Sequence, residues 1–278
     1  MFLKRIFLCS LMYMITGCIH KISDFKPQYT KTDELKIAAK NFQGSIGIIV
    51  PCIPRDIEKL SRLFESLKQQ TKQPDEVVVS LSDTTESDGK KIEEKLRSQF
   101  PSLNVNIIPY PERANAAKNR NMAAAVSQSE YLSFIDADDS MHPEKLELIA
   151  GTFVKTGAQM IIHGFTKKFY KNIPLEKKAL IIEGEQLYKI AEVQSRDYII
   201  LRSVFPIYSK YLIHAGHPTL LKSLYIKIKQ REDKLYARCE DSKFIRDVMN
   251  YLGKKDQTIT YLDLPLTEYV SALMQKYN

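Results

Sequence analysis

The feature that most constrains this chain is a regular alternation of short apolar segments with amphipathic ones between residues 45 and 165. Residues 46–50 form a continuous apolar run that ends at Pro51, and residues 76–81, Glu-Val-Val-Val-Ser-Leu, read as a second strand. Between them, apolar side chains recur from residue 57 to residue 67 at the spacing of a helix face. Short continuous apolar runs are typical of strands buried on both faces, as in a parallel sheet. The alternation therefore predicts an α/β fold built from βαβ units.

The same alternation continues downstream. Apolar residues recur at helical spacing in residues 92–100 and 146–153, and apolar runs at residues 105–108, 131–135 and 159–163 predict three more strands. Connections this short favour right-handed crossovers. We therefore expect an open, mostly parallel, Rossmann-like sheet flanked by helices.

A polar cluster follows each of three predicted strands, at residues 51–56, 80–83 and 136–139. The carboxyl ends of parallel strands lie at one edge of a sheet, and ligands of such sheets bind beyond that edge. The three clusters are therefore expected to converge on a single site.

The sharpest motif is Asp136-Ala137-Asp138-Asp139, which places three carboxylates directly after a predicted buried strand. Such a cluster is tolerated mainly when a cation or hydrogen-bond donors neutralise it. Alternation along an extended chain puts Asp136 and Asp138 on the same side. Hard oxygen ligands favour Mg²⁺ or Mn²⁺, which bind through one or two carboxylates plus substrate phosphates. The alternative is a solvated turn that caps the helix expected after His142.

Other motifs accompany the acidic one in a defined order. Residues 48–51 read Ile-Ile-Val-Pro, residues 70–71 read Gln-Thr before the second strand, and residues 119–121 read Asn-Arg-Asn upstream of Phe-Ile-Asp-Ala-Asp-Asp at residues 134–139. In order and spacing, they resemble the first-strand start, the Ala-Arg-Asn element and the Phe-Leu-Asp-x-Asp-Asp element of the family 2 glycosyltransferases, which have the GT-A fold. The resemblance covers roughly residues 45–165.

The resemblance implies a role for each matching residue. Asp138 would ligate a Mn²⁺ or Mg²⁺ ion that bridges the donor's diphosphate, and Asp136 would contact the ribose or share the metal. Asp139 is included in the expected metal set. Arg120 would lie near the nucleotide, where its fixed charge suits a phosphate or a carboxylate partner, and Pro51 would border the base.

The stretch after the second strand departs from the family pattern. Paired aspartates are common there in the family, and one of them contacts the base. Here the stretch reads Ser80-Leu81-Ser82-Asp83. We expect Asp83, in a shifted register, or Ser82 to take over the contact with the nucleotide base.

The candidate for proton transfer is Glu240-Asp241, which opens a helical pattern that continues to Leu252. The pair resembles the family's Glu-Asp element, whose aspartate serves as general base. An inverting transfer needs a carboxylate that takes the proton of the acceptor hydroxyl. Asp241 is preferred over Glu240 by its family position alone. The alternative is a helix N-terminal cap.

Three histidines lie near these motifs, at His163, His214 and His217. A lone histidine at a strand end is more often structural than a ligand. Contact with a metal or a diphosphate stays open for each of them.

These observations predict an inverting, metal-dependent hexosyltransferase with a nucleoside-diphosphate sugar as donor and a glycan, lipid or protein acceptor. A net charge of +8 suits anionic ligands. We do not expect nucleic-acid binding, because the chain carries no zinc-finger spacing, RNA-binding aromatic signature or basic-leucine pattern. The alternative is a catalytically inactive GT-A-like module that binds sugars or nucleotides at a membrane surface.

The N-terminus predicts targeting. Lys4 and Arg5 precede an apolar run at residues 6–19, which is short for a membrane span. A short signal-anchor, a cleaved secretory signal and a lipoprotein signal, with Cys18 as the lipidated residue, stay open. We expect membrane association or entry into the secretory pathway.

The expected organisation places the signal or anchor at residues 1–19 and a linker at residues 20–44. The glycosyltransferase domain would span residues 45–278. Its nucleotide-sugar half is expected at residues 45–165 and its acceptor half at residues 166–278.

Overall fold

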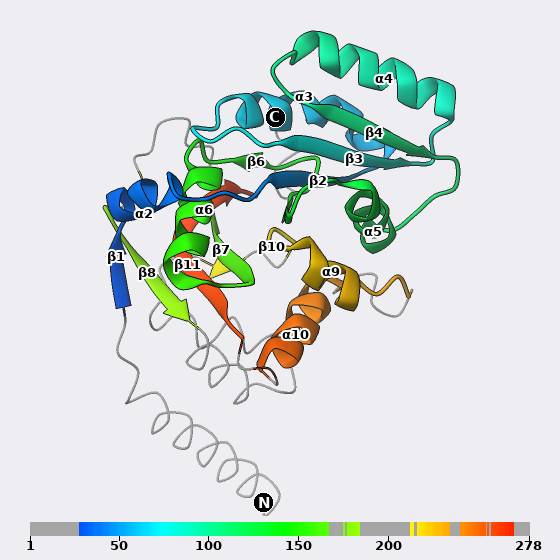
Figure 1. The fold of residues 1–278 in the computed structure, drawn as a ribbon. Coiled ribbons are helices and arrows are strands. Elements are labelled where there is room, and N and C mark those ends of the chain that lie inside the picture. Colours follow the sequence, from blue (N-terminus) through cyan, green and yellow to red (C-terminus); the bar gives the residue numbers. More distant parts are fainter. Residues whose placement is uncertain are drawn as a thin grey trace, which may run out of the picture.

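The structure is a computed structural model that describes residues 28–166, 175, 177–183, 212–213, 216–233, 240–253, 255 and 257–269. Helices flank one large mixed sheet (Figure 1). Its strands are β1 (Gln28–Lys31), β2 (Ile46–Cys52), β3 (Glu76–Ser82), β4 (Val105–Tyr110), β5 (Tyr131–Phe134), β6 (Ser140–Met141), β7 (Met160–Thr166), β8 (Lys178–Glu183), β9 (Leu212–Ile213), β10 (Thr219–Leu221) and β11 (Ile259–Glu268). The helices are α2 (Thr32–Ala39), the 3₁₀ helix η1 (Pro54–Asp56), α3 (Ile57–Lys68), α4 (Glu86–Gln99), α5 (Ala116–Val126), α6 (Lys145–Thr156), α9 (Lys222–Ile228) and α10 (Glu240–Gly253).

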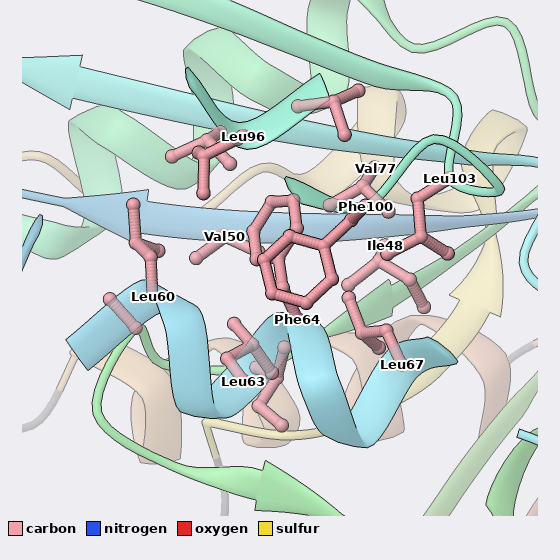
Figure 2. Packing of buried hydrophobic residues seen from close by; sticks show 14 of the residues in the cluster. Ile48, Val50, Leu60, Leu63, Phe64, Leu67, Val77, Leu96, Phe100 and Leu103 are labelled. Carbon is pink, nitrogen blue, oxygen red and sulfur yellow. The ribbon is translucent and has the colours of Figure 1, made fainter. Parts of the chain in front are cut away.

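Strands β5, β2, β3 and β4 lie side by side and run parallel, as the apolar runs predicted. Helices α3 and α4 cover one face of this half of the sheet, and α5 covers the other (Figure 1). Phe64 and Phe100 pack against Ile48, Val50 and Val77 (Figure 2). The central strands β2 and β3 are buried at every position because helices cover both of their faces, whereas the edge strand β4 is partly exposed.

The prediction of a mostly parallel sheet is correct only for this half. Antiparallel β10 lies between β5 and β7, so the fifth predicted strand, β7, does not continue the parallel series. Beyond it, β11 is parallel to β7, whereas β8 and β1 are antiparallel to their neighbours. Apolar periodicity identifies a strand but not its direction, which explains the error.

Part of the segment expected as a linker is folded. Residues 28–39 form β1, which pairs with β8, and α2, which packs on α6. Lys36 binds Glu144 at 2.5 Å, which ties α2 to the start of α6. Leu35 is the one apolar residue of α2 that is completely buried. Because a single buried apolar residue makes no periodic pattern, the helix was not recognisable from the sequence.

None of the helices in the part of the chain that the structure describes is both long enough and apolar enough to traverse a bilayer. The N-terminal apolar run at residues 6–19 lies outside the described residues.

Candidate active site

The acidic segment lies at the carboxyl end of β5, as predicted, and begins where the strand ends. Its three carboxylates differ in exposure: the side chains of Asp136 and Asp138 are 27% and 30% exposed, and that of Asp139 is completely buried. The Asp139 backbone N–H donates to the carbonyl of Asp136 at 3.1 Å, which folds the segment into a turn. The turn points two carboxylates outward and one into the protein.

His217 is the inward partner of this turn. Its Nε2 lies 3.0 Å from Oδ2 of Asp139 and 3.9 Å from Oδ2 of Asp136. The residue is brought there by β10, because the Phe134 N–H donates to the Pro218 carbonyl at 3.0 Å. Burial lowers the pKa of His217 to about 3, so the imidazole is neutral at ordinary pH. A neutral imidazole beside two carboxylates is a group of side chains that can coordinate a metal ion.

The ligand atoms of Asp136, Asp139 and His217 all lie within 4.8 Å of one another. Two carboxylate oxygens and one imidazole nitrogen suit Mn²⁺ and are compatible with Mg²⁺. Asp138, the expected metal ligand, is not in this group. Two of the three expected ligands thus meet, and His217, left open by sequence reasoning, joins them.

Asp138 faces the other side of the site. Its Oδ2 lies 3.7 Å from Nζ of Lys59, which also binds Asp56 at 2.6 Å. Arg62 donates a hydrogen bond to the Asp138 carbonyl. Both basic residues come from α3, the helix that follows the first polar cluster. Amphipathic spacing identified this helix but gave no signal for the basic residues that point to the acidic segment.

Lys145 lies beneath the acidic segment at the start of α6 and is completely buried. Among the described residues, its Nζ has no hydrogen-bond partner. Burial lowers the pKa of Lys145 to about 7, against the opposing charge of Asp139. The sequence offers no signal for this lysine, because a lysine in a first helical turn is ordinarily solvated.

Arg120 is 3% exposed and lies between the two groups of predicted site residues. Its Nη2 binds Oδ1 of Asp136 at 2.6 Å, and its Nη1 binds Oε1 of Gln230 at 3.2 Å. Nη1 also lies 3.8 Å from Oε1 of Glu240. The carboxylate of Asp136 and the start of α10 therefore lie on opposite sides of one guanidinium.

Glu240 and Asp241 occupy the first turn of α10. Burial raises the pKa of Glu240, and the Arg120 charge opposes that shift. Oδ1 of Asp241 accepts a hydrogen bond from the Ser242 N–H at 2.6 Å. This contact joins adjacent residues within α10 and is not the N-cap contact of the alternative, in which the side chain accepts from an N–H two or three residues further on. It occupies one of the two carboxylate oxygens and leaves the other for further contacts.

The stretch at residues 80–83 spans the end of β3 and the first residue after it. Ser80 and Ser82 are buried in the strand, and both bind the Asn119 side chain, at 2.9 and 3.1 Å. Asp83 is exposed and adopts a positive φ of 61°. Left-handed backbone of this kind is tolerated best by Gly, Asn and Asp. Pro51 lies at the carboxyl end of β2, directly opposite Ser80 in the register.

His163 is not part of this group. It is buried in β7, with Nδ1 2.8 Å from the Gly164 carbonyl oxygen. His214 lies outside the described residues.

A large open sheet flanked by helices, with an acidic segment at the carboxyl end of a parallel strand, matches the GT-A class of glycosyltransferase folds. The model for glycosyl transferase family 2 matches residues 47–208, and the chain belongs to that family.

Two glycosyltransferases are similar in sequence to part of this chain. An uncharacterized glycosyltransferase of Haemophilus influenzae is 30% identical over 148 residues, which are 50% of this chain and 47% of that protein. The amylovoran biosynthesis glycosyltransferase AmsB of Erwinia amylovora is 25% identical over 104 residues, 37% of this chain and 34% of that protein. The matched region thus spans less than half the length of each relative.

Solved structures share the fold. S. aureus TarS 1-349 superposes with a TM-score of 0.57 and 18% identity over 81% of this chain and 60% of TarS 1-349. The mannosyltransferase PcManGT from Pyrobaculum calidifontis, in complex with GDP-Man and Mn²⁺, gives a TM-score of 0.56 and 14% identity over 87% of this chain and 60% of PcManGT.

Proposed function

We propose that this protein is an inverting, metal-dependent glycosyltransferase that moves a sugar from a nucleoside-diphosphate sugar to an acceptor hydroxyl. The observation that carries the proposal is the group formed by Asp136, Asp139 and His217, which faces Glu240 and Asp241 across Arg120. One side of the site suits a metal and a donor diphosphate, and the other suits proton transfer.

The donor side is proposed to contain the metal ligands. Asp136, Asp139 and His217 would hold Mn²⁺ or Mg²⁺, with Asp138 at the exposed face toward the diphosphate. When bound, the metal would stabilise the negative charge of the leaving nucleoside diphosphate. Lys59, beside Asp138, adds a second positive charge at that face. Fold neighbours solved with UDP-GlcNAc or with GDP-Man and Mn²⁺ support a nucleotide-sugar donor.

The acceptor side is proposed to use Asp241 as the general base. Its carboxylate would take the proton from the acceptor hydroxyl as that oxygen attacks the anomeric carbon. The Ser242 N–H donates to one oxygen of Asp241 at 2.6 Å, and the second oxygen would take the proton. Glu240 lies beside Arg120, where burial raises its pKa, and is the second candidate.

A catalytically inactive nucleotide-binding module is the second candidate function. It is favoured by the end of β3, where Ser80 and Ser82 bind Asn119, and by the exposure of Asp83 directly after the strand. The donor base would then be contacted by Pro51 and Asp83 alone. We further propose that the N-terminal apolar run brings the protein to a membrane, where the acceptor would be a glycan, a lipid or a protein.

The test measures donor binding and transfer separately in the full chain. Calorimetry with Mn²⁺, Mg²⁺ or EDTA would follow the binding of a panel of nucleotide sugars, and product release would report transfer. Asp139→Asn and Asp138→Ala are expected to weaken binding, whereas Asp241→Asn should retain binding and lose transfer. The matched control is Asp33→Asn, an exposed carboxylate on α2.

The outcomes separate the two candidates. Metal-dependent binding without transfer to any acceptor would support the inactive module. If the wild-type chain bound no nucleotide sugar with either metal, both candidate functions would be wrong. Full transfer by Asp241→Asn would overturn the base assignment alone.

A further inference from the structure

The environment of Arg120 differs from that expected of a residue that binds a nucleotide. Its side chain is 3% exposed, and protein groups from three different parts of the chain surround its guanidinium. One of them, Asp136, belongs to the donor side. The other two, Gln230 and Glu240, belong to the segment after α9 and to the start of α10. A guanidinium so enclosed has little surface left for a phosphate.

The residue next to Arg120 holds the same segment. The Asn121 side chain accepts a hydrogen bond from the Gln230 N–H at 3.1 Å and donates to the Gln230 carbonyl at 2.9 Å. It also donates to the Glu232 carboxylate at 2.8 Å. Asn115, the N-cap residue of α5, donates to the Glu232 carbonyl at 2.9 Å. The side-chain amides of Asn115 and Asn121 therefore hold residues 230–232 against α5 by hydrogen bonds.

These hydrogen bonds determine the position of Gln230, the second partner of Arg120. Because Asn121 pairs with both backbone groups of Gln230, the Gln230 side chain is held at Nη1 of Arg120. Tyr225 of α9 donates to the same Asn121 at 2.7 Å, so α5 and α9 share this anchor. Neighbouring side chains of α5 thus link the acidic segment after β5 to α9 and α10.

The charges around Arg120 explain why such a link needs an arginine. Asp136, Glu240 and Asp241 all exert their negative charge on the buried guanidinium. Without a cation between them, carboxylates from the two sides would repel one another in a poorly solvated space. Arg has a planar fork of donors that binds two groups in fixed directions, which the point charge of Lys does not.

We propose that Arg120 is a positioning residue that fixes the acceptor-side carboxylates, Glu240 and Asp241, relative to the donor-side carboxylate Asp136. It is not a ligand of the nucleotide. The inference rests on the proposed function, in which Asp241 takes the proton and Asp136 lies at the metal and donor. Its consequence is that Arg120 acts on the transfer step through geometry and leaves donor affinity unchanged.

The experiment compares Arg120→Lys, Arg120→Met and Gln230→Met in the full chain with Mn²⁺. Misplaced reacting groups lower transfer steeply, so Arg120→Lys is expected to lower kcat about 10- to 100-fold while the donor dissociation constant stays at its wild-type value. Arg120→Met should lose more activity, with partial rescue in the lysine variant. Gln230→Met keeps the arginine and removes one hydrogen bond, and it should lower kcat less while leaving donor binding intact.

The control is Arg97→Met, which removes an arginine paired with Glu93 on α4 and should leave both quantities unchanged. If Arg120→Lys weakened donor binding by the same factor as transfer, Arg120 would be a donor ligand and the inference would be wrong. Unchanged kcat in Gln230→Met would also contradict it. If the wild-type chain bound no donor with a metal, the proposed function itself would fail, which is a separate result.

Discussion

Nε2 of His217 and Oδ2 of Asp139 lie 3.0 Å apart, and neither side chain is exposed to solvent. Burial keeps the imidazole neutral, so the contact is not an ion pair within the ordinary pH range. Nδ1 of His217 lies 3.1 Å from Oγ1 of Thr267 in β11, which fixes the orientation of the ring. A neutral imidazole whose Nδ1 is held by Thr267, and whose Nε2 is directed at two carboxylates, is oriented so that it can coordinate a cation together with them.

From this relationship we predict that His217→Ala weakens metal binding. Mutation of a residue that hydrogen-bonds to a metal ligand typically lowers metal affinity about 10- to 100-fold. Loss of a direct ligand should lower the affinity for the metal by at least that factor. Calorimetric titration of the full chain with Mn²⁺ would measure the effect. His142→Ala, which alters a more exposed histidine after β6, is the control. Equal Mn²⁺ affinity in His217→Ala and wild type would remove His217 from the metal site.

The second prediction concerns Lys145 and the pH dependence of stability in metal-free protein. Burial lowers its pKa to about 7, whereas the ordinary value is 10.5. Between these values the unfolded chain binds more protons than the folded one, so the free energy of unfolding rises with pH, by at most about 1.4 kcal/mol per pH unit. The stabilisation is lost as the pH falls toward 7.

Urea unfolding at pH 7 and pH 9 in EDTA would show this rise in the wild-type protein. Lys145→Met should lack it, and Lys40→Met, an exposed lysine, should retain it. An identical rise in Lys145→Met would mean that the pKa of Lys145 is not lowered.

The third prediction concerns Glu76, whose Oε1 accepts four hydrogen bonds of 2.5 to 2.8 Å from residues 127–129. Burial raises the pKa of this carboxyl, but the hydrogen bonds outweigh burial and lower it. The resulting stabilisation is present above the usual pKa and is lost as the pH falls below it.

Glu76→Gln should therefore lower the free energy of unfolding at pH 7 by roughly 2–3 kcal/mol, since hydrogen bonds to charged groups are the strong ones. The loss should shrink in acid. Urea unfolding of Glu76→Gln and of the exposed Glu94→Gln would measure it. If both variants lost the same amount of unfolding free energy, the effect of Glu76→Gln would come from the change of charge and not from the hydrogen bonds of Glu76.

The fourth prediction concerns the contact between α2 and α6. A Cβ added at Gly151 would lie 1.9 Å from the Leu35 carbonyl oxygen, so Gly151→Ala must push α2 off α6. Overpacking of this kind costs about 1–3 kcal/mol. Thermal unfolding and limited proteolysis between residues 28 and 40 would report it, with Val154→Ala, an exposed change on the same helix, as the control. If Gly151→Ala resisted proteolysis in this segment as well as the wild type does, α2 would be able to shift without loss of its packing on α6.

Sequence reasoning recovered the parallel half of the fold because its signal is local. Runs such as residues 46–50 and 77–79 are apolar, since each strand is covered on both faces. The second half was harder, because β10 is short and its direction depends on β5 and β7 at once. Strand direction is a property of the assembled sheet and leaves no period in the sequence.

The residues of the site also fall into those that the local sequence indicates and those that only the folded structure brings together. Three carboxylates after a buried strand predict a cation from the residues alone, because like charges at that spacing need a neutralising partner. Two of the partners lie far along the chain: His217 comes before β10, and Lys59 lies on α3. The third, Lys145, is close in sequence, but it is buried only because α6 packs into the fold. Nothing in their own neighbourhoods distinguishes them from ordinary surface or core residues.

The sequence by itself therefore determined that an α/β sheet places an acidic segment at the carboxyl edge of a strand, because apolar periodicity and charge clustering are read within a few residues. Only the tertiary structure decided which carboxylate turns inward to His217, which one faces Lys59, and how Arg120 joins the two sides. The physical reason is distance along the chain. Burial, pairing and pKa depend on groups that become neighbours only when the sheet has assembled.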